Sequence, residues 1–178
     1  MKLIPAIPGE TGALSLRQFI HEDSRGIFSH LFRQSDPCFD QLPDFHSIRN
    51  IYSSYNPSQF TFRGFHKQNS PSSESKIMRC ITGEVIHFVL KTVSRQIYLD
   101  SNVLSCSNGV ASYIPRDCFS AFLTTKPNST VIYLADADYD PVQGIGIRWN
   151  DPILPKFLED VIPHVISEKD LTFPDYKI

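Results

Sequence analysis

The chain has 178 residues, with 17 Lys and Arg against 19 Asp and Glu and a formal net charge of −2. This balance excludes a general nucleic-acid binder, which usually carries a strong basic excess, but it permits a small anionic ligand held by a few local charges. With 41% hydrophobic and 20% charged residues, the composition is that of a globular protein rather than a disordered one. The length predicts a single domain over residues 1–178.

The N-terminal segment and the cysteines indicate the cellular compartment of the protein. The first residues, MKLIPAIPGETGAL, contain no apolar run of signal-peptide length, and no window of the chain reaches 18 apolar residues. The four cysteines show no CxxC spacing, so free thiols are a simpler interpretation than disulfides. We therefore expect a cytoplasmic protein that does not bind membranes.

Short strand-like runs separated by turn residues dominate the chain. Thirteen prolines leave few windows for long helices, which favours β structure. After a strand-forming run at Phe62–Gln68, the runs Lys76–Cys80 and Glu84–Lys91 flank Thr82-Gly83, which predicts a tight hairpin turn between them. Further strands are expected at 96–99, 110–114, 121–125 and 130–135.

The periodicity of these runs predicts an all-β fold. In the run at 84–91, odd-numbered residues lie on one face of the strand and even-numbered residues on the other. Many short strands at 8–12-residue spacing indicate a sandwich or a barrel. Only Ile153–Val165 has helical spacing, and Pro155 and Pro163 keep any helix there short.

The strongest local signal is the sequence FRGFHKQ at 62–68. It places Arg63 and His66 three residues apart, and Gly64 between them lets another group approach the strand closely. Lys76 follows after a serine-rich loop, and Gly83 follows Lys76 by seven residues. A second set of turn and strand residues comes later, at Gly109, Pro115, Asp117 and Ser120.

These spacings resemble the two cupin motifs, which in metal-binding cupins supply three histidines and a glutamate to one divalent ion. His66 matches the first histidine, but Gln68, Lys76 and Ser120 stand at the other ligand positions. One imidazole, an amide and an ammonium cannot hold zinc or iron, which need three or four deprotonated ligands. The resemblance therefore implies a jelly-roll barrel with a short C-terminal helical segment, and the substitutions predict a site without metal or other cofactor.

A narrower resemblance accounts for these substitutions. Segments spread over most of the chain are similar, in order and spacing, to the dTDP-4-dehydrorhamnose 3,5-epimerase family, the metal-free cupins of deoxysugar nucleotide biosynthesis. The matching segments are DSRGIF at 23–28, RGFHKQ at 63–68, Lys76 with Gly83, Tyr133 with YDP at 139–141, GIRWNDP at 146–152 and ISEKD at 166–170. Each segment alone is weak, and their order and spacing together identify the family.

The resemblance implies an epimerase of a nucleoside-diphosphate 4-keto-6-deoxy sugar, acting at C3, C5 or both in surface or specialised glycan biosynthesis. The C4 carbonyl acidifies the neighbouring C–H groups, so that a base can form an enolate and an acid can return a proton from the opposite face. By resemblance His66 is the base, Asp170 orients its ring, Lys76 stabilises the enolate oxygen and Tyr133 is the acid. A nearby cation such as Lys76 is expected to help the phenol release its proton.

The substrate contacts follow from the same resemblance. Arg25 and Arg63 match arginines that grip the diphosphate, and Arg25 is expected to come from the partner subunit of a homodimer formed by exchange of N-terminal strands. Tyr139 and Phe28 are expected to stack on the base or the sugar. Gln68 is placed among the substrate-binding residues.

Several positions depart from the family pattern. Ser120 replaces a second active-site histidine, and Lys91 replaces an aspartate, which changes the local charge by two units. His30 and His87 stand where the family usually has carboxylates, and we expect them to face the pocket. These differences indicate a divergent epimerase.

Two other functions fit the same residues. One is a sugar-nucleotide ketoisomerase, which also uses acid–base enolisation on this scaffold. The other is a catalytically silent cupin that binds a sugar nucleotide or a protein partner. The fold does not decide among these, because one fold can carry many functions.

Overall fold

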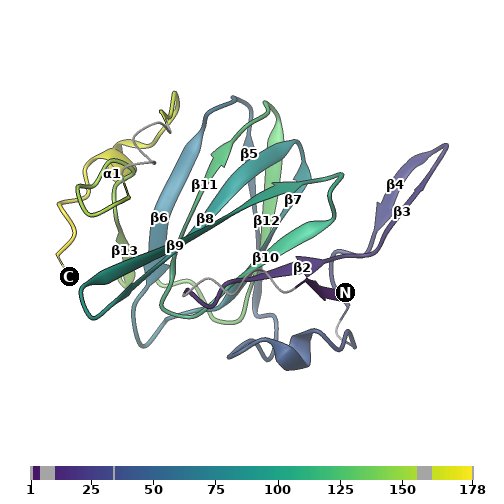
Figure 1. Ribbon diagram of the computed structural model, residues 1–178, viewed down its shortest axis with the longest axis horizontal. Coiled ribbons are helices and arrows are strands. Elements are labelled where there is room, and N and C mark those ends of the chain that lie inside the picture. Colours follow the sequence, from purple (N-terminus) through teal and green to yellow (C-terminus); the bar gives the residue numbers. More distant parts are fainter. Residues whose placement is uncertain (1, 5–10, 34, 156–161, 178) are drawn as a thin grey trace.

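Two antiparallel sheets lie face to face in the computed structural model, which describes residues 2–4, 11–33, 35–155 and 162–177 (Figure 1). In spatial order, the six-stranded sheet consists of β1 (Lys2–Ile4), β2 (Leu14–Arg17), β10 (Val110–Ile114), β7 (Lys76–Thr82), β12 (Ser129–Ala135) and β5 (Asn50–Asn56). The five-stranded sheet consists of β13 (Gly144–Gly146), β6 (Phe62–Gln68), β11 (Phe119–Thr124), β8 (Glu84–Val93) and β9 (Gln96–Ser105). This arrangement confirms the expected all-β, jelly-roll type of fold.

Three smaller elements complete the described chain. A two-stranded ribbon of β3 (Ile20–Asp23) and β4 (Gly26–Ser29) projects away from the sheets (Figure 1). A short 3-10 helix, η1 (Phe39–Gln41), follows the ribbon, and the helix α1 (Glu168–Leu171) lies in the C-terminal segment.

The hairpin predicted at Thr82-Gly83 is wrong. The turn is present, but β7 pairs with β10 and β12, whereas β8 pairs with β9 and β11, so the chain crosses from one sheet to the other at this point. Gly83 is required there because its φ is +72° and a Cβ would lie 2.2 Å from Ser129 Oγ. The true hairpin joins β8 and β9 through Ser94 and Arg95, both of which have positive φ.

The remaining strand predictions are confirmed, and most of the strands are longer than predicted. The helix expected at Ile153–Val165 is not seen in its described parts, because 153 ends a turn, 154 is a bend, and 162–165 contain a bend and a bridge; residues 156–161 lie outside the described residues. The C-terminal helix is α1 instead, and Ser167 is its N-cap.

Both faces of β8 are buried, which explains its unbroken apolar sequence. Val85 and Val89 pack in the cluster between the two sheets, and Phe88 and Leu90 pack in a second cluster on the outer face of the five-stranded sheet. The C-terminal segment covers that outer face, with Ile147 fully buried. Burial of apolar side chains on this face therefore brings the C-terminal segment, and α1 with it, against β6.

Four free cysteines are present, as expected, and Cys38, Cys80 and Cys118 are buried. Burial raises the pKa of the Cys38 and Cys118 thiols to about 11, so both stay protonated near neutral pH. No helix in the described part of the chain is long and apolar enough to cross a membrane.

Candidate active site

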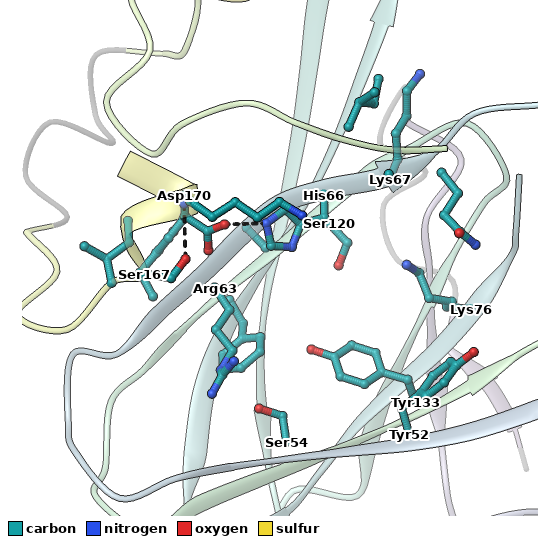
Figure 2. A pocket seen from close by; sticks show the side chains of 18 of the residues that line it. Tyr52, Ser54, Arg63, His66, Lys67, Lys76, Ser120, Tyr133, Ser167 and Asp170 are labelled. Atoms are coloured by element: carbon teal, nitrogen blue, oxygen red, sulfur yellow. Dashed lines mark hydrogen bonds and ion pairs between the residues drawn. The ribbon is translucent and has the colours of Figure 1, made fainter. Parts of the chain in front are cut away.

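A pocket of about 680 Å³ lies between the two sheets, next to the C-terminal segment (Figure 2). Strands β5, β7 and β12 of one sheet and β6, β11 and β13 of the other contribute its walls. The residues predicted for the site that line this pocket are Arg63, His66, Gln68, Lys76, Ser120, Tyr133, Tyr139 and Asp170.

His66 and Asp170 form a close pair at one side of the pocket. His66 Nε2 lies 2.6 Å from Asp170 Oδ1, and the His66 side chain is 44% exposed while that of Asp170 is 5% exposed. Burial acts to raise the pKa of Asp170, but the hydrogen bond and charge of His66 outweigh it and hold that pKa below its ordinary value. The carboxylate is therefore ionised and can orient the imidazole and stabilise its protonated form.

The C-terminal helix places Asp170 at this position. The Asp170 backbone N–H donates to Ser167 Oγ at 3.1 Å, which caps α1, and the Gly64 N–H donates to Asp170 Oδ2 at 3.4 Å. Gly64 also permits the close strand approach predicted from the sequence, because its φ is +131° and a Cβ would lie 2.4 Å from the Cβ of Ala121.

Lys76 lies across the pocket from the His66–Asp170 pair (Figure 2). Its Nζ donates to Glu74 Oε1 at 2.8 Å, and the two side chains are 16% and 6% exposed. The positive charge predicted from the sequence is thus present but paired with a carboxylate. Glu74 was not predicted from the sequence, although residues two apart in an extended chain point to the same side.

Tyr133 points into the pocket from β12, directly opposite Tyr52 on β5 (Figure 2). Burial raises the pKa of the Tyr133 phenol above its ordinary value, and the nearby Arg63 guanidinium acts against this shift. Arg63, rather than Lys76 as expected, is therefore the cation whose charge acts to lower the pKa of this phenol.

Arg63 is held in place without neutralisation of its charge. Its Nε donates to Asn56 Oδ1 at 2.8 Å, and no carboxylate among the described residues forms an ion pair with it. The guanidinium therefore keeps donors for an anionic ligand.

Gln68 is buried and its amide is already engaged. Its Nε2 donates to the Ser72 carbonyl at 3.1 Å, and its Oε1 accepts the Asp140 N–H at 2.6 Å. Gln68 therefore fixes the loop that carries Tyr139, whose side chain is largely exposed at the rim of the pocket.

Ser120 faces the pocket, and His87 lies behind it. Ser120 Oγ is 3.0 Å from His87 Nε2, and His87 is fully buried but does not line the pocket, contrary to expectation. Burial, together with the charge of Lys76, lowers the pKa of His87 to about 3. His87 is thus a neutral side chain that reaches the pocket only through Ser120.

Besides His87, four predicted residues lie outside this pocket. Arg25 is exposed on the β3–β4 ribbon and pairs with Asp23 at 2.7 Å, and Phe28 and His30 line a separate hollow of about 350 Å³. Lys91 lies four residues beyond His87, which is about 13 Å along an extended strand. The expectation that His30 and Lys91 face the pocket is therefore wrong for this chain.

Further pocket residues were missing from the sequence prediction. They are Tyr52, Ser54, Lys67, Glu74, Ser167 and Lys169. Lys67, Ser167 and Lys169 lie within the segments RGFHKQ and ISEKD, which carry the family resemblance, but they were assigned no role. Tyr52 and Ser54 depend on the register of β5 with β12, which local spacing does not reveal. No group of three or more His, Cys, Asp or Glu suited to a metal occurs in the described ranges.

Comparisons with known proteins agree with this geometry. A family model described as dTDP-4-dehydrorhamnose 3,5-epimerase matches residues 10–177. The dTDP-4-dehydrorhamnose 3,5-epimerase of Mycobacterium tuberculosis is 30% identical over 176 residues, which cover 93% of this chain and 84% of that protein. That of Sinorhizobium fredii is 28% identical over 155 residues, which cover 85% of this chain and 78% of that protein.

Solved structures show the same fold. The dTDP-4-dehydrorhamnose 3,5-epimerase of Bacillus anthracis, with TDP and PPi bound, has a TM-score of 0.81 at 23% identity and covers 98% of this chain and 99% of its own. ChmJ, a 3'-monoepimerase from Streptomyces bikiniensis in complex with dTDP-quinovose, has a TM-score of 0.81 at 20% identity, covering 96% and 86%. The family model spans nearly the whole chain, and residues from several of the segments that carry the resemblance line the pocket: Arg63, His66, Gln68, Lys76, Tyr133, Tyr139 and Asp170. The chain therefore belongs to the dTDP-4-dehydrorhamnose 3,5-epimerase family of isomerases.

Proposed function

We propose that this protein epimerises a nucleoside-diphosphate 4-keto-6-deoxy sugar at C3, C5 or both, through an enolate. The observation that carries the proposal is the His66–Asp170 pair, 2.6 Å apart, in a pocket that also holds Lys76 and Tyr133. A base, a cation and a phenol around one cavity are the groups needed to remove a proton beside a carbonyl and to return one.

His66 acts as the base through Nδ1. Its Nε2 is bonded to the ionised Asp170, which favours the tautomer that carries the proton on Nε2 and the free lone pair on Nδ1. When Nδ1 takes a proton from the sugar carbon, the imidazolium that forms is stabilised by the same carboxylate. Asp170 itself remains unprotonated, because its pKa is lowered in this pair.

Lys76 and Tyr133 complete the cycle from the other side of the cavity. The Lys76 ammonium donates to the C4 oxygen and stabilises the negative charge that develops there. Tyr133 then supplies the proton to the carbon from the face opposite His66, which inverts the centre. The Arg63 guanidinium beside Tyr133 stabilises the phenolate that remains after this step.

Positive side chains at the pocket support a nucleoside diphosphate as the carrier of the sugar. Arg63, Lys67 and Lys169 all line the cavity, and Arg63 keeps free donors. TDP and dTDP-quinovose in the structures of two relatives support dTDP as the nucleotide. The free cysteines fit an enzyme of the cytoplasm.

The β3–β4 ribbon supports a homodimer in which Arg25 serves the partner's pocket. Within the described ranges the two strands of the ribbon pair with each other and with no other strand, and Ile27 and Phe28 on it are 47% and 63% exposed. Exposed apolar side chains on a projecting ribbon are suited to burial against a second copy of the chain. Phe28 then contacts the nucleotide, with Arg25 on its diphosphate.

Solvent-deuterium exchange tests the proposal. The protein is incubated in D₂O with dTDP-4-keto-6-deoxyglucose, and uptake at C3 and C5 is followed by NMR and mass spectrometry. Uptake at one or both carbons, lost in His66→Ala, supports epimerisation. A carbonyl that moves from C4 to C3 indicates a ketoisomerase. Equal inertness of wild type and His66→Ala, with nucleotide-sugar binding retained in both, indicates a silent binding protein.

A further inference from the structure

Glu74 lines the pocket but has no role in the proposed steps. Its side chain is 6% exposed, and its Oε1 accepts the Lys76 ammonium at 2.8 Å. The second carboxylate oxygen, Oε2, is buried and has no hydrogen-bond partner among the described residues, although Glu74 lines the pocket. A buried carboxylate oxygen that accepts no hydrogen bond is unfavourable, so a hydrogen-bond donor on a ligand would stabilise it.

The Glu74 carboxylate and the Lys76 ammonium lie side by side and have opposite hydrogen-bonding capacities. An ammonium only donates hydrogen bonds, and an ionised carboxylate only accepts them. A carbonyl group only accepts, and a hydroxyl group on the adjacent carbon can donate. The pair is therefore complementary to a ketone with a neighbouring hydroxyl, and in one orientation only.

We propose that Glu74 is a specificity-determining residue whose Oε2 accepts the hydroxyl group next to the substrate carbonyl, while Lys76 donates to the carbonyl oxygen. This inference rests on the proposed function. In a 4-keto-6-deoxy sugar the hydroxyl is that of C3, because C5 carries only the methyl carbon and the ring oxygen. Glu74 thus selects α-hydroxy ketones and rejects 3-deoxy sugars.

The charges in the pocket fix the same orientation. Lys76 is neutralised by Glu74, whereas Arg63 has no carboxylate partner among the described residues. A diphosphate is therefore attracted to the Arg63 side rather than to the neutralised Glu74–Lys76 pair. The sugar ring then lies with its ketone toward Lys76 and its nucleotide away from it.

A comparison of two substrates with two variants tests this role. The substrates are dTDP-4-keto-6-deoxyglucose and its 3-deoxy analogue, and the readout is kcat/KM for deuterium uptake beside the carbonyl. The variants are Glu74→Gln and Glu84→Gln; the second removes a carboxylate from a surface pair whose Lys126 Nζ lies 3.9 Å away. In Glu74→Gln, Lys76 retains the amide oxygen as its partner, so the NH₂ group faces the substrate hydroxyl in place of an acceptor.

We expect Glu74→Gln to lower kcat/KM about tenfold or more on the hydroxylated substrate and less than about twofold on the 3-deoxy analogue. Glu84→Gln should change neither. An equal fall on both substrates overturns the inference, because Glu74 would then act only by holding Lys76. Thermal unfolding of each variant separates a folding defect from a loss of recognition.

The inference can fail independently of the proposed function. If the wild-type protein exchanges no deuterium, the epimerase proposal fails, and calorimetric Kd values for the same two nucleotide sugars then test Glu74. Preference for the hydroxylated ligand that is lost in Glu74→Gln supports the inference in that case. Equal affinities for the two ligands overturn it.

Discussion

The pocket and the β3–β4 ribbon both carry residues predicted for one site, but they are built in different ways. Most of the pocket residues project from strands of two sheets whose registers are fixed by buried clusters on both faces. The ribbon's strands pair with no other described strand and leave Ile27 and Phe28 exposed. The difference shows that one chain is enough to assemble the groups proposed for acid–base chemistry, whereas the ribbon residues take no part in this pocket.

The largest expected effect is on the pocket side, at the His66–Asp170 pair. His66→Ala should lower kcat by about 10²–10⁴-fold, because it removes the general base, and Asp170→Asn should approach the same loss because it no longer favours the productive tautomer. Deuterium-exchange rates give kcat, and calorimetry with dTDP checks that the nucleotide still binds. A variant of either residue with wild-type kcat would contradict the proposed base.

Lys76→Ala should produce the next largest effect. Because its charge matters most as the enolate forms, kcat should fall about 10²–10³-fold, with a smaller change in affinity for the substrate. Steady-state kinetics and binding of unreactive dTDP separate the two quantities. A change in KM alone would show that Lys76 only binds the ground state.

Arg25→Ala tests the ribbon, where a weaker effect is expected. Loss of one phosphate contact should raise KM about tenfold with little change in kcat, and Arg95→Ala, on the β8–β9 turn, is the matched control. A mixture of Arg25→Ala and His66→Ala proteins should regain activity at low substrate concentration, because hybrid dimers contain one intact site. No recovery in hybrids shown to form by mass spectrometry would place Arg25 outside the partner's pocket.

Acid should destabilise the barrel through His87. Its pKa is lowered from 6.5 to about 3 by burial and by the charge of Lys76, so between these values the unfolded chain binds a proton that the folded chain does not. Stability therefore falls as the pH drops through this window, by at most about 1.4 kcal/mol per pH unit for one proton. Urea unfolding at pH 7.5 and 5.0 measures the loss, and His87→Gln should reduce it. An unchanged pH dependence in that variant would assign the loss to other groups.

Chelation is expected to have the smallest effect. The described pocket lining offers one imidazole, three lysines and two carboxylates that are already bonded to His66 and Lys76, which is a poor donor set for zinc or iron. Activity should therefore survive dialysis against EDTA. Loss of activity that one divalent ion restores would overturn this expectation.

The sequence predicted those parts of the site that depend on local spacing. The residues predicted for the site from the run at 63–68, and Lys76 after it, do line the pocket with their side chains; the roles of base and cation stay a prediction. The Glu74 pairing, the Tyr52–Tyr133 register and the Arg63–Tyr133 interaction were missed. The last two depend on long-range contacts that no single segment encodes, whereas the Glu74–Lys76 pair is local and its two-residue spacing could have indicated it.

The same distinction explains the errors in the fold. The turn at Gly83 was predicted correctly as a turn, but its role as a crossing between sheets depends on the pairing partners of β7 and β8. Similarly, the helix expected at Ile153–Val165 gave way to α1, which is fixed by the Ser167 cap and by docking against β6. Family resemblance supplied Asp170 as the partner of His66, which local pattern alone would not have done.

The position of α1 in the chain sets when one wall of the pocket is synthesised. Asp170 comes after every described strand of the two sheets, so the carboxylate that contacts His66 is among the last parts of the pocket to be synthesised. A chain clipped before Ser167, the N-cap of α1, would lack this carboxylate, together with the pocket wall that Ser167 and Lys169 contribute. The proposed proton transfer at His66 therefore depends on the last described helix, although that helix adds no strand to either sheet.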